Sequence, residues 1–371
     1  MKEINLRVKV PSSGVFTYPV IFGKNHWQKH LRAFLEKKTF SKVGFLVDEK
    51  VFAAWNKEIE SFGSSDILLI PSGESSKNIN KVIEITGTLT SKGYDRKSLL
   101  VAMGGGVVGD LCGFIASIYM RGIPYVQIPT TVLSIVDSSL GGKTGVDTPY
   151  GKNLVGSFHF PSLVIADTLF LQTLPEEQRK NGFVEMVKHA LIIDGTYYER
   201  LMRPFSEEEW PSLLLRSCEI KARIVQKDPK EQNLRQILNF GHTLGHALEH
   251  AAGYSLLHGF AVAWGIIGEA FLSMKKKLLS EDELQRLIRD FQHKGLLVSP
   301  EIISKLSWED VRLPLLHDKK NQRHTVYVVL IDKIGRVKPF QGRYSHPFDE
   351  VSLKEAFNFL QNIAEDRHER H

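Results

Sequence analysis

Short apolar runs alternate with helix-like segments through the first half of the chain. Five runs rich in Val, Ile and Leu, bounded by Gly, Pro, Ser or Asp, are residues 41–48, 64–74, 96–106, 123–131 and 161–167. Their apolar positions are continuous, which is typical of strands that are buried on both faces. Strands of this kind separated by helical segments predict a mostly parallel sheet covered by helices.

The pattern becomes mostly helical after residues 171–182. Three later segments with helical periodicity are residues 183–192, 212–226 and 280–295. One short β-like run returns at residues 324–332. Because the strand and helix patterns occupy different parts of the chain, we predict an α/β domain over residues 1–175 and a mostly α-helical domain over residues 176–371.

Composition narrows the class of protein. The chain has 371 residues, of which 42% are hydrophobic, so it can bury two cores. Two cysteines form no disulfide framework, and the N-terminus lacks the apolar run of a signal peptide. No window reaches about 18 apolar residues without charge, so we expect a cytoplasmic protein without a membrane span. The net charge of +6 suits an anionic ligand but is too diffuse to indicate nucleic acid.

A glycine-rich turn joins the third predicted strand to a helix. The G-x-G-x-x-G spacing is formed by Gly104, Gly106 and Gly109. Glycines there let backbone N–H groups approach a pyrophosphate at a helix N-terminus, which favours nucleotide binding over a turn needed only for packing. The acidic residue expected about 20 positions later is absent, since Thr130 stands there. Asp48, at the end of an earlier strand, is a candidate partner for the ribose.

A second glycine-rich stretch, residues 141–145, does not form a P-loop. That motif requires a glycine where Asp137 stands, five positions before Gly142. Lys143 in this stretch is by itself more typical of a solvated surface lysine than of an anion ligand. Other basic residues near the motifs raise the possibility of a pocket for a substrate with several negative groups: Lys152, Lys188, Lys221, Arg235 and Lys319.

Three histidines at intervals of four residues lie in residues 239–250. His242 and His246 share a helix face, but an isolated pair of this kind is more often a polar surface than a metal site. The glycines Gly241 and Gly245, the nearby His258 and an upstream Glu185 favour metal binding, because a catalytic zinc takes three protein ligands and keeps one position open. Spacing alone does not choose among five histidines: His189, His242, His246, His250 and His258.

Seven motifs in order resemble the 3-dehydroquinate synthase family of sugar phosphate cyclases. They are residues 104–117, 128–147, 151–167, 173–175, 185–192, 238–249 and 257–259. The resemblance covers roughly residues 48–320. It implies an N-terminal Rossmann-like domain that binds NAD, a C-terminal helical domain, and an active site in the cleft between them. It also implies a homodimer.

The resemblance implies a reaction without net redox change. The substrate would be 3-deoxy-D-arabino-heptulosonate 7-phosphate, and the products 3-dehydroquinate and phosphate. A hydroxyl is oxidised transiently by NAD, phosphate is eliminated, the ketone is reduced again, and an intramolecular aldol reaction closes the ring. A metal that holds two substrate hydroxyls would make the alcohol easier to oxidise.

The family pattern implies a role for each matching residue. Zinc or cobalt would bind Glu185, His242 and His258; His246 would face the substrate, and His250 would be structural. The substrate's carboxylate, hydroxyls and phosphate would be met by Lys143, Asn153, Lys188, Lys221, Arg235, Asn239 and Lys319, with Asp137 near the reacting centre. Lys320 is an alternative to Lys319. NAD would be bound by Asp48, Glu74, Lys77, Gly105, Gly106, Asp110, Thr130, Thr131, Lys143, Lys152 and Thr173.

Two positions depart from the family pattern, and three other functions compete with this one. Phe260 stands where the family usually has glutamate, and Val184 where alanine is common. One rival is a cyclase that acts on sedoheptulose 7-phosphate, and another is a dehydrogenase of the glycerol dehydrogenase type. The third is a non-catalytic binding protein. The complete ligand and lysine set favours the cyclase with a carboxylate-bearing substrate.

Overall fold

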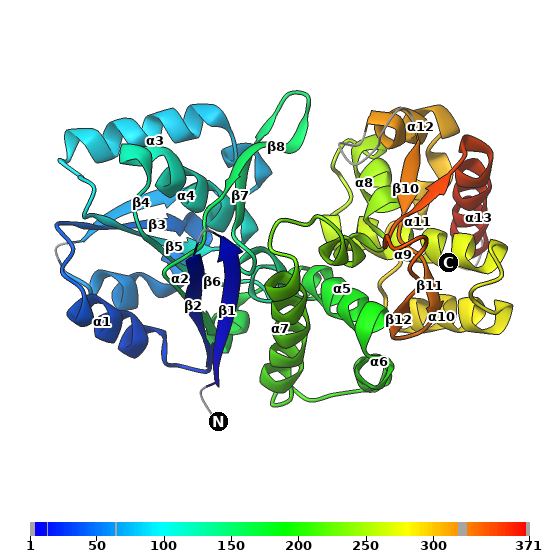
Figure 1. Cartoon of the computed structure of the whole chain (residues 1–371), viewed down its shortest axis with the longest axis horizontal. Coiled ribbons are helices and arrows are strands. Elements are labelled where there is room, and N and C mark those ends of the chain that lie inside the picture. Colours follow the sequence, from blue (N-terminus) through cyan, green and yellow to red (C-terminus); the bar gives the residue numbers. More distant parts are fainter. Residues whose placement is uncertain (1–3, 13, 64, 318–324, 369–371) are drawn as a thin grey trace. The chain divides into compact units, whose positions relative to one another are not determined.

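A computed structural model describes residues 4–12, 14–63, 65–317 and 325–368 (Figure 1). The chain forms two compact units. Unit 1 comprises Met1–Arg179 and Glu207–Pro229, and unit 2 comprises Lys180–Ser206 and Lys230–His371. Residues Glu207–Pro229 therefore return to unit 1, although they follow the boundary expected near residue 175.

Unit 1 is built on a seven-stranded sheet with the order β1-β2-β9-β6-β5-β3-β4. The strands are β1 Ile4–Ser12, β2 Gly14–Gly23, β3 Val43–Asp48, β4 Asp66–Ile70, β5 Leu99–Gly104, β6 Tyr125–Pro129 and β9 Leu163–Asp167. All neighbours are parallel except β1 and β2. The five strands predicted from apolar runs are confirmed. The β1–β2 hairpin and the separate β7–β8 hairpin, Lys143–Thr148 with Gly151–Phe158, were not predicted.

The central strands are buried on both faces, as their continuous apolar sequences require. The helices of this unit that cover the sheet include α1 Trp27–Lys37, α2 Glu49–Glu60, α3 Ile79–Ser91 and α4 Gly106–Ile118. In β3, Leu46 packs with α3 and α4, whereas Phe45 and Val47 pack with α1 and α2. Figure 1 shows these two helix pairs on opposite sides of the sheet. The α/β prediction for the N-terminal part is confirmed.

Helix α7, Trp210–Lys227, belongs to unit 1 because it packs beside β1 and a π-helical turn, η3, at Ser134–Ser138. Cys218 is buried and its thiol lies 3.4 Å from the Ile135 carbonyl oxygen. The helical pattern of this segment was predicted correctly from sequence. Its return to the first unit depends on contacts far along the chain, which periodicity does not report.

Unit 2 is mostly helical, as predicted. Its helices are α5 Glu176–Ile193, α6 Gly195–Met202, α8 His242–Ala251, α9 His258–Lys275, α10 Glu281–His293, α11 Pro300–Lys305, α12 Trp308–His317 and α13 Glu350–His368. Two small strand pairs, β10 Val326–Val328 with β13 His346–Phe348 and β11 Ile331–Lys333 with β12 Arg336–Val337, complete the unit. The β-like run at residues 324–332 thus contributes β10 and β11.

Helix α9 lies at the centre of unit 2 and crosses α8 at close range. Nearly all of its residues from Gly259 to Ser273 are buried, as expected for a helix that is apolar all round. A Cβ atom on Gly265 would overlap the Gly241 carbonyl oxygen, and one on Gly245 would lie 3.0 Å from the Ala261 carbonyl oxygen. Of the helices described, none combines the length and apolarity needed to cross a membrane.

Replacing Gly265 with alanine should destabilise the protein by about 1–3 kcal/mol, because the added methyl group forces α8 and α9 apart. Gly87→Ala is the matched control, since a Cβ atom there meets nothing within 4 Å in the exposed middle of α3. That change should stabilise by about 0.4–1 kcal/mol. Urea unfolding of both variants measures the difference; equal stability of Gly265→Ala and wild type would contradict the close crossing.

Candidate active site

A carboxylate and two imidazoles meet in unit 2 on three different helices. Glu185 on α5 is fully buried, and its Oε1 lies 3.6 Å from His242 Nε2 on α8 and 3.9 Å from His258 Nε2 on α9. Ligand atoms around a tetrahedral zinc ion are separated by about 3.3 Å. The two carboxylate–imidazole distances of 3.6 and 3.9 Å are somewhat longer than this spacing, so a cation between the three groups would draw them slightly together.

The negative charge of the buried Glu185 carboxylate is only partly balanced by the described residues. Lys188 Nζ forms an ion pair with Oε2, whereas Oε1 has no hydrogen-bond partner among the described residues. A buried carboxylate is costly unless it is paired and hydrogen-bonded. A divalent cation against Oε1 would supply the missing partner, so the residues fit a metal ion.

The two imidazoles are oriented by contacts at their other ring nitrogens. His242 Nδ1 lies 3.3 Å from the Phe240 carbonyl oxygen, and His258 Nδ1 lies 3.2 Å from Glu249 Oε2. Metal-binding histidines commonly hold the second nitrogen in this way, which leaves Nε2 for the metal. Burial lowers the pKa of His258, but the hydrogen bond with Glu249 and the charges of Glu249 and Glu185 outweigh it, so the pKa is raised.

His246 also belongs to this cluster. Its ring centroid lies 5.2 Å from that of His242 and 5.6 Å from that of His258, and the three histidines offer ligand atoms within 4.8 Å of one another. A set of three imidazoles is thus the geometric alternative to a set that includes Glu185. His250 is exposed and packs edge-on against Tyr254, away from any such grouping among the described residues.

Two side chains that sequence reasoning missed hold the helix starts beside the cluster. Glu269 on α9 is fully buried and accepts hydrogen bonds from the backbone N–H groups of Gly241 and Thr243, at 2.7 and 3.1 Å. Asn181 Oδ1 accepts from Gly259 N at 2.6 Å. A carboxylate at a helix N-terminus is favourable. A single acidic residue inside the apolar α9 was the sequence signal that could have identified Glu269.

The two departures from the family pattern lie in the packing around the cluster. Phe260 is buried on the first turn of α9, and Val184 is buried beside Glu185 on α5. Neither replaces one of the imidazoles or the carboxylate. Both therefore alter the apolar surroundings of the cluster and leave its ligand atoms in place.

In unit 1 the glycine turn lies where the strand order reverses. Along β4-β3-β5-β6-β9 the chain order is 2-1-3-4-5, and ligands bind such sheets at the carboxyl ends of the strands on either side of the reversal. These ends carry Asp48 on β3 and Gly104 on β5. A Cβ atom on Gly104 would lie 3.2 Å from the Asp48 Cβ atom.

The two glycines after Gly104 pack closely against their neighbours. A Cβ atom on Gly105 would lie 3.3 Å from Thr131 Cγ2, and one on Gly106 would lie 3.2 Å from Ser138 Oγ. Helix α4 begins at Gly106 without a side-chain cap, so no capping side chain occupies its first N–H groups. This arrangement fits the pyrophosphate of a dinucleotide.

Other residues predicted for NAD lie near the same edge of the sheet. Asp48 Oδ1 accepts from Lys50 N at 2.9 Å and from Ser72 Oγ at 2.7 Å. The Thr130 N–H donates to the Gly104 carbonyl oxygen at 2.9 Å, which ties the end of β6 to the glycine turn. Thr173 Oγ1 accepts from Trp55 Nε1 at 3.2 Å.

Lys77 contacts several of the predicted residues. Its buried Nζ lies 2.7 Å from Asp110 Oδ2, 2.6 Å from Asn153 Oδ1 and 3.7 Å from Glu74 Oε1. Burial lowers the pKa of Lys77, but Asp110 and Glu74 outweigh it and raise the pKa. Asp147, which was not predicted, joins this network: its Oδ1 accepts from Asn153 N at 2.8 Å.

The residues predicted for the substrate are divided between the units. In unit 1, Lys221 Nζ donates to the Asp137 carbonyl oxygen at 2.6 Å and to Oδ1 at 2.7 Å. Lys143 and Lys152 lie on β7 and β8. Unit 2 carries Lys188, His246, the buried Arg235 and Asn239. Lys319 and Lys320 lie outside the described residues.

Asn239 and Arg235 share the short turn η5, Leu234–Asn239. Asn239 Nδ2 donates to Glu231 Oε1 at 2.8 Å, and Arg235 is 2% exposed. A buried guanidinium and an oriented amide suit recognition of a carboxylate. Both residues, which the family resemblance implied, lie on this one short turn.

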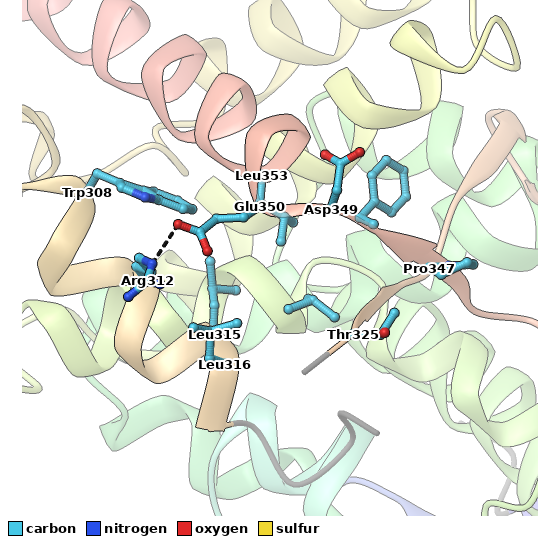
Figure 2. Close-up of a pocket in the computed structure, with 11 residues that line it drawn as sticks. Trp308, Arg312, Leu315, Leu316, Thr325, Pro347, Asp349, Glu350 and Leu353 are labelled. Atoms are coloured by element: carbon cyan, nitrogen blue, oxygen red, sulfur yellow. Dashed lines mark hydrogen bonds and ion pairs between the residues drawn. The ribbon is translucent and has the colours of Figure 1, made fainter. Parts of the chain in front are cut away.

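A cavity of about 500 Å³ in unit 2 contains none of the predicted residues (Figure 2). Its walls come from α12, α13, β10 and β13, and Arg312 Nε donates to Glu350 Oε1 at 2.6 Å across it. Trp308, Phe348 and Leu353 supply much of its apolar lining. This cavity therefore lies apart from the predicted catalytic residues.

Comparison with known proteins follows the same division of the chain. Residues 67–181 match the model of the 3-dehydroquinate synthase N-terminal domain, and residues 182–321 match that of the C-terminal domain. A 3-dehydroquinate synthase of Methylacidiphilum infernorum is 42% identical over 342 residues, which cover 90% of this chain and 93% of the relative. This chain belongs to the 3-dehydroquinate synthase family.

Solved structures of related cyclases share the fold. A 2-deoxy-scyllo-inosose synthase superposes with a TM-score of 0.84 at 24% identity, covering 95% of this chain and 99% of that one. The 2-epi-5-epi-valiolone synthase of Streptomyces hygroscopicus subsp. jinggangensis, solved with NAD+ and Zn2+ bound, superposes with a TM-score of 0.80 at 26% identity, with the same coverage. The predicted combination of an α/β domain with a mostly helical domain is confirmed.

Asp147→Asn should flatten the pH dependence of stability. Burial raises the pKa of Asp147 from 3.8 to about 6, so folding favours its protonated form. This contribution is fully present below pH 3.8 and is lost as the pH rises through about 6. A shift of about 2 units is worth roughly 3 kcal/mol at most, and solvent screening of this half-exposed group reduces it to about 1 kcal/mol.

Urea unfolding at about pH 4.5 and about pH 7 measures this effect. Over that range wild type should lose about 1 kcal/mol of stability that Asp147→Asn keeps. The amide can still accept from Asn153 N, so the hairpin contact is retained as an internal control. Identical pH profiles for the two proteins would show that Asp147 is not held in a desolvated setting.

Proposed function

We propose that this chain converts 3-deoxy-D-arabino-heptulosonate 7-phosphate to 3-dehydroquinate and phosphate. The observation that carries the proposal is membership of the 3-dehydroquinate synthase family across both parts of the chain, with 42% identity to a named synthase over 90% of its length. The reaction places the enzyme in the shikimate pathway, which leads to chorismate and the aromatic amino acids. Fold alone would not establish this activity, because the same architecture serves dehydrogenases.

NAD is proposed to bind unit 1 at the reversal of the strand order. Gly105 and Gly106 leave room for the pyrophosphate, and Asp48 is the ribose partner. The remaining residues of the proposed site are Glu74, Lys77, Asp110, Thr130, Thr131, Lys143, Lys152 and Thr173. The relative that is 26% identical was solved with NAD+ and Zn2+, which supports both cofactors in this chain.

Glu185, His242 and His258 are the proposed metal ligands, with zinc or cobalt as the ion. The buried charge of Glu185 favours this set over three imidazoles, because a site that left the carboxylate out would leave Oε1 buried without a partner. His246 is then available to the substrate. When bound, NAD supplies the hydride acceptor and donor, and the metal supplies a Lewis acid at the hydroxyl to be oxidised.

Basic side chains are proposed to hold the anionic groups of the substrate. Arg235 and Asn239 suit the carboxylate, since a guanidinium makes paired hydrogen bonds to such a group. The other proposed contacts are Asp137, Lys143, Asn153, Lys188, Lys221 and Lys319 or Lys320. Asp137 and Lys221 are already hydrogen-bonded to each other, which fixes both side chains near one point.

Sedoheptulose 7-phosphate is the alternative substrate, and it lacks the carboxylate that Arg235 would bind. A dehydrogenase of the glycerol dehydrogenase type would have little use for the set of lysines. A non-catalytic protein would be expected to lose a metal ligand or Lys143. The presence of all these residues supports the synthase.

We also infer the location of the enzyme, its oligomeric state and the type of ligand it binds. A cytoplasmic location is consistent with two buried cysteines that form no disulfide. The homodimer rests on the family resemblance. The charge of +6 is spread along the chain and supports small anions as ligands over nucleic acid.

Phosphate release by the purified protein with NAD and 3-deoxy-D-arabino-heptulosonate 7-phosphate tests the function. Release should occur, should stop with EDTA and return with zinc or cobalt, and should not be accompanied by NADH build-up. Sedoheptulose 7-phosphate, run in parallel, should release little. Release from that sugar alone would assign the chain to the other cyclases, and steady NADH accumulation would assign it to the dehydrogenases.

A further inference from the structure

Glu249 holds one of the proposed metal ligands from a neighbouring helix. It lies on α8 seven residues after His242, two helical turns along the same face. Its Oε2 lies 3.2 Å from His258 Nδ1, and the residue is 4% exposed. Helix α8 therefore supplies one ligand directly and contacts the outer nitrogen of the second.

The two histidines differ in how they are fixed. His242 has a side chain that is 11% exposed, and its Nδ1 faces the backbone carbonyl of Phe240, which no substitution removes. The side chain of His258 is 30% exposed, and it stands at the first position of α9, where no side chain caps the helix. Backbone packing at Gly259 sets the start of α9 but leaves the imidazole ring free to rotate about its own side-chain torsions.

We propose that Glu249 is a positioning residue that orients the His258 imidazole so that Nε2 faces the metal and Glu185. An Nδ1–H donated to Glu249 leaves the lone pair on Nε2, the atom that lies 3.9 Å from Glu185 Oε1. Carboxylate partners of this kind orient metal-binding histidines and make them more basic. The proposal rests on the metal set of the proposed function, and it adds a residue that the family motifs did not assign.

Cobalt binding to the full-length apoprotein, measured by competition with a chelator and by visible absorption, tests the role of Glu249. Glu249→Ala should bind Co2+ roughly 10–100-fold more weakly, with a changed absorption band, because the ring loses its anchor. Glu249→Gln keeps an oxygen that accepts from Nδ1–H, so it should recover most of the affinity and the wild-type band. Glu365→Ala, an exposed change on α13, is the matched control and should bind as wild type does.

The outcomes separate this proposal from the metal assignment on which it rests. His258→Ala should lose Co2+ binding; if it binds normally, the metal set and the role of Glu249 both fail. If His258→Ala loses the metal while Glu249→Ala keeps wild-type affinity and absorption, only the role of Glu249 fails. No recovery in Glu249→Gln would likewise overturn positioning through this hydrogen bond. Should Glu249→Ala not fold, Glu249→Leu, which fills a similar space without an acceptor oxygen, takes its place: it should bind Co2+ more weakly than Glu249→Gln, and equal affinity would overturn the proposal.

Discussion

The buried carboxylate of Glu185 is the constraint on which the helical unit depends. A buried carboxylate is costly in an apolar interior, so its surroundings must supply positive charge. Lys188 supplies part of it from the next turn of α5. The remaining positive charge must come from the side of Glu185 that faces His242 and His258. A divalent ion bound there would supply it.

Close packing of α8 against α9 brings those two imidazoles together. Gly245 and Gly265 allow the backbones to approach, and Glu269 fixes the start of α8 by accepting its first N–H groups. None of these contacts involves the imidazole nitrogens themselves, but each restricts where the imidazoles can lie. The precision of the cluster thus comes from glycines and from buried polar groups that the chemistry itself never uses.

In the first unit, the parallel sheet determines where the proposed nucleotide-binding residues lie. Reversal of the strand order between β3 and β5 opens a crevice at their carboxyl ends, and Asp48 and the glycine turn lie there because those strands end there. Lys77 and its carboxylates then connect the turn to the β7–β8 hairpin. The proposed dinucleotide site and the hairpin that carries Lys143 and Lys152 are in this way joined within one unit.

Sequence patterns captured the local features and missed those that depend on distant pairing. Continuous apolar runs revealed five strands, and Gly104 to Gly109 revealed the turn, because both signals lie within one short segment. Spacing left five histidines open, since the packing of α8 and α9 decides which of their histidines lie near Glu185, whereas His189 lies near it on α5 itself. Glu249, Asp147 and the return of α7 to unit 1 were not predicted for the same reason.

X-ray absorption at the zinc edge of the metal-loaded protein tests the central claim most directly. One carboxylate oxygen and two imidazole nitrogens at about 2.0–2.2 Å, with no change in His246→Ala, are the expected result. Three imidazoles and no carboxylate oxygen, with one imidazole lost in His246→Ala, would contradict the role of the buried carboxylate as a metal ligand.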